Sequence, residues 1–233
     1  SISRIYEAPT ITIKEPKIKL EKMSDFFTAR VNGYDEHMLN EVEGCKEAYI
    51  KMAKLVPGNC EAILDLGCGT GLELDGIFKK LPNVSVTGID LTQAMLDKLN
   101  QKYHNKNIRL ICGNYFNVDL GENTFDTVIS FQTMHHFPHD QKVELYKKIN
   151  KALKHKGIYI ECDYMVLEQS MEDELFDLNA EIRHEMNIPD GEFYHFDTPC
   201  TVNNQIEMFR EAGFLSADMV WRMENTTIIA AKK

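Results

Sequence analysis

The stretch ILDLGCGTGLELD, residues 63–75, constrains the fold of this chain more than any other. It begins with an apolar run that holds a single acid, and three glycines then alternate with Cys68 and Thr70. An apolar run that ends in glycines indicates a buried strand turning tightly into a helix. Parallel sheets bind ligands beyond the carboxyl ends of their strands, so we expect a ligand at this turn.

Strand and helix patterns alternate along the rest of the chain. We expect strands at residues 62–66, 84–90, 108–113, 125–131, 157–163 and 224–233. We expect helices at residues 38–56, 72–80, 92–102 with Thr92 as N-cap, 140–154, 203–212, and along the apolar stripe Met171, Leu175, Leu178, Ile182 and Met186. This alternation predicts an α/β fold with a largely parallel sheet and helices on both faces.

The chain divides into an arm and one domain. Residues 1–22 alternate apolar and polar side chains around Pro16, which predicts an extended arm or a broken edge strand. Residues 23–233 then form a single domain, in which residues 164–202 are a cap over the substrate. The stretch GEFYHFDTPC in this cap either lines a pocket, with Tyr194 and His195 as polar tips, or packs in the core.

Composition excludes several classes of protein. The formal net charge of −10 opposes binding to nucleic acid. No apolar run reaches the ~18 residues of a membrane span, and no secretory signal is visible. The six cysteines form no C-x-x-C pair, which argues against a zinc site or a disulfide framework and favours buried thiols in the cytoplasm.

The spacing of the glycines limits the classes of ligand that can bind at this turn. A phosphate loop requires a lysine that is absent here, and a dinucleotide fold requires glycine where Leu72 stands. The spacing G-x-G-x-G suits a ligand with no pyrophosphate. Asp90 ends the next strand about 20 residues later, where an acid can hold both hydroxyls of a ribose. The pattern therefore predicts a nucleoside ligand without a phosphate.

Five stretches carry a family resemblance: ILDLGCGTG, VTGIDLTQAML, ICGNYFNV, FDTVISFQTMHHF and LKHKGIYIECD. Together they resemble the successive motifs of class I S-adenosylmethionine-dependent methyltransferases of the small-molecule type, over residues 26–233. The resemblance implies a Rossmann-like, seven-stranded, mostly parallel sheet. It also implies a reversed hairpin at the carboxyl end, which GFLSADMVWRMENTTIIAAKK fits.

The resemblance also assigns residues to S-adenosylmethionine. Asp65 and the glycines would lie against its methionine part and ribose, Asp90 would hold the ribose hydroxyls, and Leu91 would pack on the adenine. Asn114 stands in place of an acid that receives the adenine amino group, and Tyr34 would close over the cofactor. The whole expected set is Tyr34, Asp65, Gly67, Cys68, Gly69, Gly71, Asp90, Leu91, Asn114, Tyr115, Ser130 and Gln132.

The stretch MHHFPH places His135, His136 and His139 in the loop after the fourth strand. Asp163 ends the fifth strand, next to that loop in such a sheet, and a histidine oriented by a carboxylate is a candidate general base. We expect His135 first, and His136 second, to act with Asp163. The alternative is that one histidine packs on the cofactor and the other caps a helix. No carboxylate or cysteine stands beside the histidines at ligand spacing, so we expect no metal.

The sequence thus predicts a methyltransferase that acts on a small-molecule acceptor and releases S-adenosylhomocysteine, as a monomer or a homodimer. One alternative transfers another group from a modified S-adenosylmethionine or modifies tRNA. The other alternative binds S-adenosylmethionine as a sensor without turnover.

Overall fold

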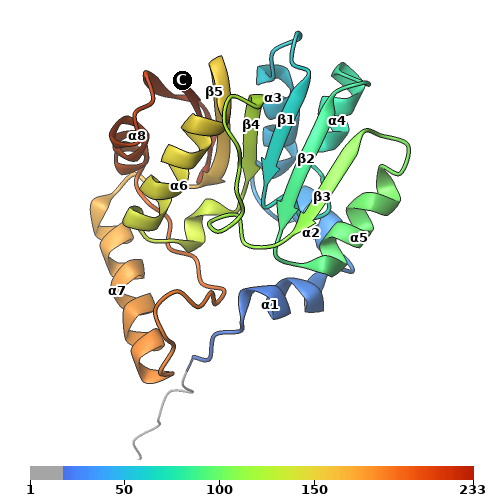
Figure 1. The fold of residues 1–233 in the computed structure, drawn as a ribbon. Helices are drawn as coiled ribbons and strands as arrows, with labels where there is room; N and C mark the ends of the chain where they lie inside the picture. Colours follow the sequence, from blue (N-terminus) through green and yellow to red (C-terminus); the bar gives the residue numbers. More distant parts are fainter. Residues whose placement is uncertain (1–17) are drawn as a thin grey trace, which may run out of the picture.

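The computed structural model describes residues 18–233 and contains one seven-stranded sheet in the order β3-β2-β1-β4-β5-β7-β6 (Figure 1). β7 runs antiparallel to both of its neighbours, and the remaining pairs are parallel. The predicted fold class, including the reversed hairpin, is therefore confirmed. The strands are β1 Ala62–Leu66, β2 Ser85–Asp90, β3 Ile108–Cys112, β4 Phe125–Phe131, β5 Leu153–Tyr164, β6 Ser216–Met223 and β7 Thr226–Lys232.

Helices pack on both faces of the sheet, and successive residues of β1 serve different core layers. Ile63 belongs to a layer with α3 and α4, whereas Leu64 and Leu66 belong to a layer with α6 and α8. The helices are α1 Met23–Arg30, α2 Tyr34–Asn40, α3 Cys45–Leu55, α4 Leu74–Lys80, α5 Gln93–Lys102, α6 His139–Ala152, α7 Gln169–Glu185 and α8 Val202–Glu211, with a 3₁₀ turn η1 Met134–His136. This alternation of buried faces explains why β1 reads as a nearly continuous apolar run.

Several predicted boundaries were wrong. The helix expected at 38–56 is two helices, α2 and α3, because Gly44 takes a φ of +79° between them. The helix after the glycine loop begins at Leu74, since residues 71–73 complete the turn. The helix α6 ends at Ala152 and β5 starts at once, so Gly157 lies inside a strand and not at a helix end.

The predicted dry stripe of α7 is confirmed only in part. Ile182 is buried as predicted, but Met171 and Leu178 are exposed, and Glu172 faces inward. The carboxylate of Glu172 accepts hydrogen bonds from the backbone N–H of Thr201 and the side chain of Asn204, which compensates for its burial. The inward position that hydrophobic periodicity assigns to an apolar side chain is therefore held by Glu172 and its hydrogen bonds.

A short clasp joins residues 21–23 to residues 193–195. Lys22 forms an antiparallel bridge with Tyr194, the N–H of Met23 donates to the carbonyl of Phe193 at 3.0 Å, and the N–H of His195 donates to the carbonyl of Glu21 at 2.9 Å. The clasp ties the start of α1 to the segment that follows α7 (Figure 1). Most of the predicted arm, residues 1–17, lies outside the described residues.

Among residues 18–233, we find no helix with the length and apolar character needed to cross a membrane.

Candidate functional site

A narrow cleft opens at the carboxyl ends of β1, β2 and β4. The sheet order reverses between β1 and β4, which is where ligands enter open α/β sheets. The lining of the cleft is Met23, Phe27, Tyr34, Gly67, Gly69, Asp90, Leu91, Thr92, Met95, Tyr115, Phe131, Gln132, Thr133, His136 and Phe137. Six of the residues assigned to the cofactor from the sequence are therefore together here with Tyr34: the two glycines, Asp90, Leu91, Tyr115 and Gln132.

The three glycines of the loop serve different needs, although each has a positive φ. A Cβ on Gly67 would lie 2.5 Å from Oγ1 of Thr133, and one on Gly71 would lie 2.9 Å from Leu99. A Cβ on Gly69 would meet no protein atom within 4 Å. The close packing of the protein thus requires Gly67 and Gly71, whereas Gly69 borders open space in the cleft.

Asp90 connects the two loops that frame the cleft. One carboxylate oxygen accepts the N–H of Gly69 at 3.1 Å, and the other accepts the N–H of Thr92 at 3.0 Å. Burial raises the pKa of Asp90 to about 6, and these two hydrogen bonds oppose that rise. Thr92 is the N-cap residue of α5, as predicted, although its hydroxyl makes no capping bond.

Two buried acids lie beneath the glycine loop. Both carboxylate oxygens of Asp65, and one of Glu73, have no hydrogen-bond partner in the structure. Burial raises the pKa of Asp65, and the nearby charge of Glu73 raises it further. Unpaired buried carboxyl groups are costly, so this arrangement favours a ligand that brings positive charge or donor groups.

A larger cavity of about 840 Å³ adjoins the cleft. Phe27, Tyr34, Gln132 and His136 line both spaces and form the junction between them. Gln132 follows β4 with a φ of +54°, a conformation that costs a non-glycine residue energy and that clusters at functional sites. This junction is the point at which a molecule in the cavity approaches one in the cleft.

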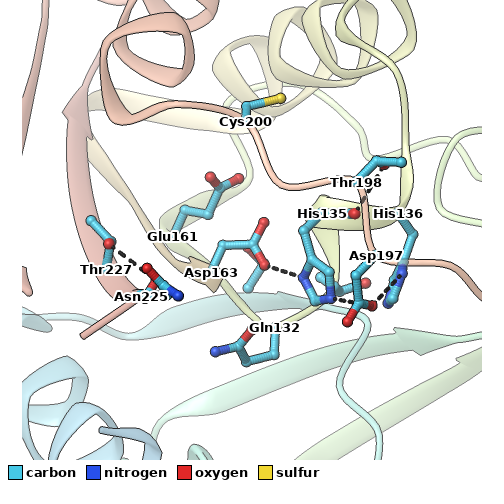
Figure 2. Close-up of polar contacts among 12 residues, drawn as sticks. Gln132, His135, His136, Glu161, Asp163, Asp197, Thr198, Cys200, Asn225 and Thr227 are labelled. Carbon is cyan, nitrogen blue, oxygen red and sulfur yellow. Dashed lines mark hydrogen bonds and ion pairs between the residues drawn. The ribbon is translucent and has the colours of Figure 1, made fainter. Parts of the chain in front are cut away.

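A group of histidines and carboxylates lies at one wall of the cavity (Figure 2). Nδ1 of His135 lies 2.5 Å from Oδ1 of Asp163, and Nε2 of His135 lies 3.2 Å from Oδ1 of Asp197. Nδ1 of His136 donates to the carbonyl of Phe196 at 3.2 Å and lies 3.6 Å from the same Asp197 oxygen. The predicted pairing of His135 with Asp163 is therefore present, and Asp197 is an additional member.

The charges in this group are strongly coupled. Burial alone would lower the pKa of His135, but the carboxylates of Asp163 and Asp197 outweigh it and raise the pKa to about 10. Burial and the nearby charge of His135 lower the pKa of His136 well below its ordinary value. The bond to His135 holds the pKa of Asp197 far below that of a free aspartate, against the opposing effect of burial.

Three predicted cofactor residues have other neighbours. The hydroxyl of Ser130 bonds to that of Tyr159 at 2.7 Å in the core. Oδ1 of Asn114 accepts the N–H of Phe116 at 2.9 Å, and Asn114 is outside the lining of the cleft. The side chain of Cys68 is buried against Gly88. A Cβ added to Gly88 would lie 2.8 Å from the sulfur of Cys68.

The cap and the histidine loop gave mixed outcomes. His195 lines the cavity, whereas Tyr194 lines a separate hollow beside α7. Nε2 of His139 lies 3.4 Å from Glu172, apart from His135 and His136. Asp197 was missed, although it stands within the aromatic stretch of the cap. Its only sequence signal was an acid two residues after His195.

Comparisons with known proteins agree with this architecture. A family described as "Methyltransferase domain" matches residues 63–157. The carboxy-S-adenosyl-L-methionine synthase of Nautilia profundicola is 25% identical over 227 residues, covering 91% of this chain and 96% of that protein.

Two solved structures share the fold. A putative O-methyltransferase from Nostoc punctiforme aligns with a TM-score of 0.68 at 20% identity, over 93% of this chain and 63% of that one. Human N-acetylserotonin methyltransferase in complex with S-adenosylmethionine aligns with a TM-score of 0.60 at 15% identity. The alignment covers 89% of this chain and 55% of that one. The chain thus spans less than two thirds of the length of each of these two structures.

Proposed function

The chain belongs to the class I S-adenosylmethionine-dependent methyltransferases, and from this premise we propose that it methylates a small molecule bound in the cavity beside the cleft. S-adenosylmethionine supplies a methyl group already activated on a sulfonium, and S-adenosylhomocysteine is the product that remains.

The residues of the cleft fit S-adenosylmethionine. The carboxylate of Asp90 stands at the end of β2, where an acid can bind the ribose hydroxyls. The open space beside Gly69 leaves room for the ligand to approach the backbone. Asp65 and Glu73 lie outside the lining of the cleft, but both oxygens of Asp65 and one of Glu73 lack a hydrogen-bond partner, and this buried acidic character favours a ligand with an ammonium and a sulfonium.

The junction of the two spaces is the observation that carries the proposal. Tyr34, Gln132 and His136 contact both, so an acceptor in the cavity lies next to the reacting end of the cofactor. Because the leaving group needs no activation, the main task of the protein is to position the acceptor.

Histidines at the junction can also manage a proton. A hydroxyl, thiol or ammonium acceptor must lose a proton when it is methylated. His136 lies at the junction itself, and His135 lies behind it with its orientation set by Asp163. The raised pKa of His135 keeps that ring protonated, whereas the lowered pKa of His136 keeps it neutral, so we assign proton removal to His136, with His135 and Asp163 as positioning residues.

The relative from Nautilia profundicola, which is named a carboxy-S-adenosyl-L-methionine synthase, makes formation of a carboxylated S-adenosylmethionine the second candidate. A carboxylate on the methyl carbon of the sulfonium calls for a cation at the junction. The residues that line the cleft include neither lysine nor arginine. The larger cavity contains two cations, Arg30 and His135, the second kept charged by its raised pKa, and they are outnumbered by the carboxylates of Glu43, Asp197 and Glu224. This distribution of charge favours transfer of an uncharged methyl group.

The test is incubation with S-adenosylmethionine that carries a deuterated methyl group, together with a pool of cell metabolites. We expect mass spectrometry to find S-adenosylhomocysteine and one acceptor that carries the label. A carboxylated sulfonium product would support the second candidate. Cofactor binding without any turnover across the pool would contradict both and favour a sensor.

A further inference from the structure

We propose that His135, His136 and Asp197 bind one divalent transition-metal ion at the wall of the acceptor cavity. Each offers one ligand atom, and these three atoms all lie within 4.8 Å of one another. All three residues line the cavity, so the ion would face the acceptor directly (Figure 2). Sequence spacing predicted no metal because no carboxylate stands beside the histidines, but the fold brings Asp197 to them from 62 residues away.

The spacing of the donor atoms suits a small metal ion. Oδ1 of Asp197 lies 3.2 Å from Nε2 of His135 and 3.6 Å from Nδ1 of His136. Four ligands at the ~2.0–2.2 Å bond lengths of a tetrahedral zinc site lie roughly 3.3 Å from one another. A shift of the side chains would bring both nitrogens and the oxygen onto one ion, provided that Nδ1 of His136 gives up its proton and its hydrogen bond to the carbonyl of Phe196. The three protein ligands leave a fourth position of a tetrahedral site open toward the cavity.

A second carboxylate orients the first ligand. Asp163 is buried, and its contact of 2.5 Å with Nδ1 of His135 directs Nε2 toward Asp197. Histidines that bind metals commonly use the other ring nitrogen to donate to such a carboxylate. Without a metal, a proton lies between Nε2 of His135 and Oδ1 of Asp197. The metal ion would replace this proton.

The donor set indicates the class of metal. Two imidazoles and one carboxylate suit zinc, iron or cobalt, whereas magnesium and calcium prefer oxygen ligands. The neighbouring trio of His139, Glu172 and Cys200 is less suitable. The ammonium of the buried Lys142 lies 3.1 Å from the sulfur of Cys200 and would repel a cation.

If the proposed function holds, this site specifies its acceptor as a molecule with a hydroxyl oxygen that can bind the metal. Coordination lowers the pKa of a bound O–H group, as it does for water. With His135 and His136 bound to the ion, neither could serve as the base, and the lowered pKa of the bound hydroxyl would replace that role. The proton would leave to solvent, the oxygen would bond to the methyl carbon, and the carbon–sulfur bond would break to release S-adenosylhomocysteine.

The experiment needs neither acceptor nor cofactor. The full chain is treated with a chelator and titrated with Co²⁺ or Zn²⁺ by calorimetry, and Co²⁺ binding is also followed by visible absorption. We expect one equivalent to bind with a dissociation constant near or below ~1 μM, and Mg²⁺ not to compete. Asp197→Asn and His135→Gln should weaken binding at least tenfold, and Asp163→Asn by about 10–100-fold.

His139→Gln is the matched control, because it removes a histidine of the neighbouring trio and should leave affinity unchanged. Circular dichroism and thermal unfolding verify that each variant is folded. The metal site would be overturned if the parent protein bound no equivalent of Co²⁺ or Zn²⁺. It would also be overturned if Asp197→Asn and His135→Gln bound the metal as tightly as the parent does. Since metal binding is read directly, failure to find an acceptor leaves this result standing.

Discussion

Oδ1 of Asp163 lies 2.5 Å from Nδ1 of His135, which joins the end of β5 to the 3₁₀ turn that follows β4. The two strands are neighbours in the sheet, and Ser130 pairs with Glu161 in their register. The sheet therefore sets the distance between the carboxylate and the imidazole.

This pairing predicts the behaviour of single and double variants. Asp163→Asn should lower turnover of the identified acceptor by about 10²–10⁴, because it removes the group that fixes the ring of His135. The double variant Asp163→Asn, His135→Ala should be little worse than either single variant, as for residues that act as one unit. Steady-state rates at saturating cofactor measure this. Multiplicative losses would mean that the two residues act separately.

Asp90→Ala should weaken S-adenosylmethionine binding by tenfold or more. The variant removes charge-assisted hydrogen bonds to the ribose, each of which contributes ~1.5–3 kcal/mol. Calorimetric titration gives the dissociation constant. The control is Asp97→Ala, an exposed acid on α5, which should bind as the parent does.

Cofactor affinity should also fall at acid pH. Burial raises the pKa of Asp90 to about 6, so the carboxylate that we assign to the ribose hydroxyls becomes protonated as pH falls below that value. We expect the dissociation constant to rise by up to about tenfold per pH unit well below pH 6, and to level off above it. Asp90→Asn should lose this component of the profile. If its profile matches that of the parent, other groups such as Asp65 control the dependence.

The glycine loop allows a comparison of two similar substitutions. Gly67→Ala should destabilise the fold, because its Cβ would lie 2.5 Å from Thr133 at a φ of +66°. Gly69→Ala adds a methyl group next to open space, so it should lose cofactor affinity with a smaller loss of stability. Urea unfolding and calorimetric titration separate the two effects. Equal unfolding free energies for both variants would contradict this division of roles.

Glu161 of β5 is the central acceptor of a buried hydrogen-bond network. It accepts the hydroxyls of Tyr146 at 2.6 Å and Tyr159 at 3.0 Å, and the amide of Gln205 at 2.7 Å. In Glu161→Gln, an N–H donor of the new amide would face the N–H donor of Gln205. This loss of a buried hydrogen bond should lower the free energy of unfolding by about 1–3 kcal/mol. Glu144→Gln on the exposed face of α6 is the control and should stay within ~0.5 kcal/mol of the parent.

The sequence predicted the parts of the site that depend on adjacent strands. β1 and β2 pair in parallel, so a glycine loop after one strand and an acid at the end of the next must meet at one edge. The position of Asp90 follows from that rule, as does the pairing of His135 with Asp163. Ser130 shows where the rule stops, because the alternation of a strand also sends residues into the core, where it bonds with Tyr159.

Residues brought in by irregular segments were beyond prediction. Asp197 reaches His135 through a segment without regular structure, and no periodicity fixes where such a segment passes. The exposed Met171 illustrates the same limit for helices, since the inward face of α7 is set by Glu172 and its partners at Thr201 and Asn204. Hydrogen bonds between distant segments decided both cases.

The clasp between residues 21–23 and 193–195 holds together two distant parts of the chain that line the cavity, namely α1 and the segment with His195 and Asp197. The cleft lies mainly among the loops that follow β1, β2 and β4, and the two spaces share only Phe27, Tyr34, Gln132 and His136 among their lining residues. If the cavity binds the acceptor and the cleft the methyl donor, as we propose, substitutions in the outer wall should alter which acceptor binds and leave donor binding unchanged. A new acceptor preference could then arise without any change in the donor site.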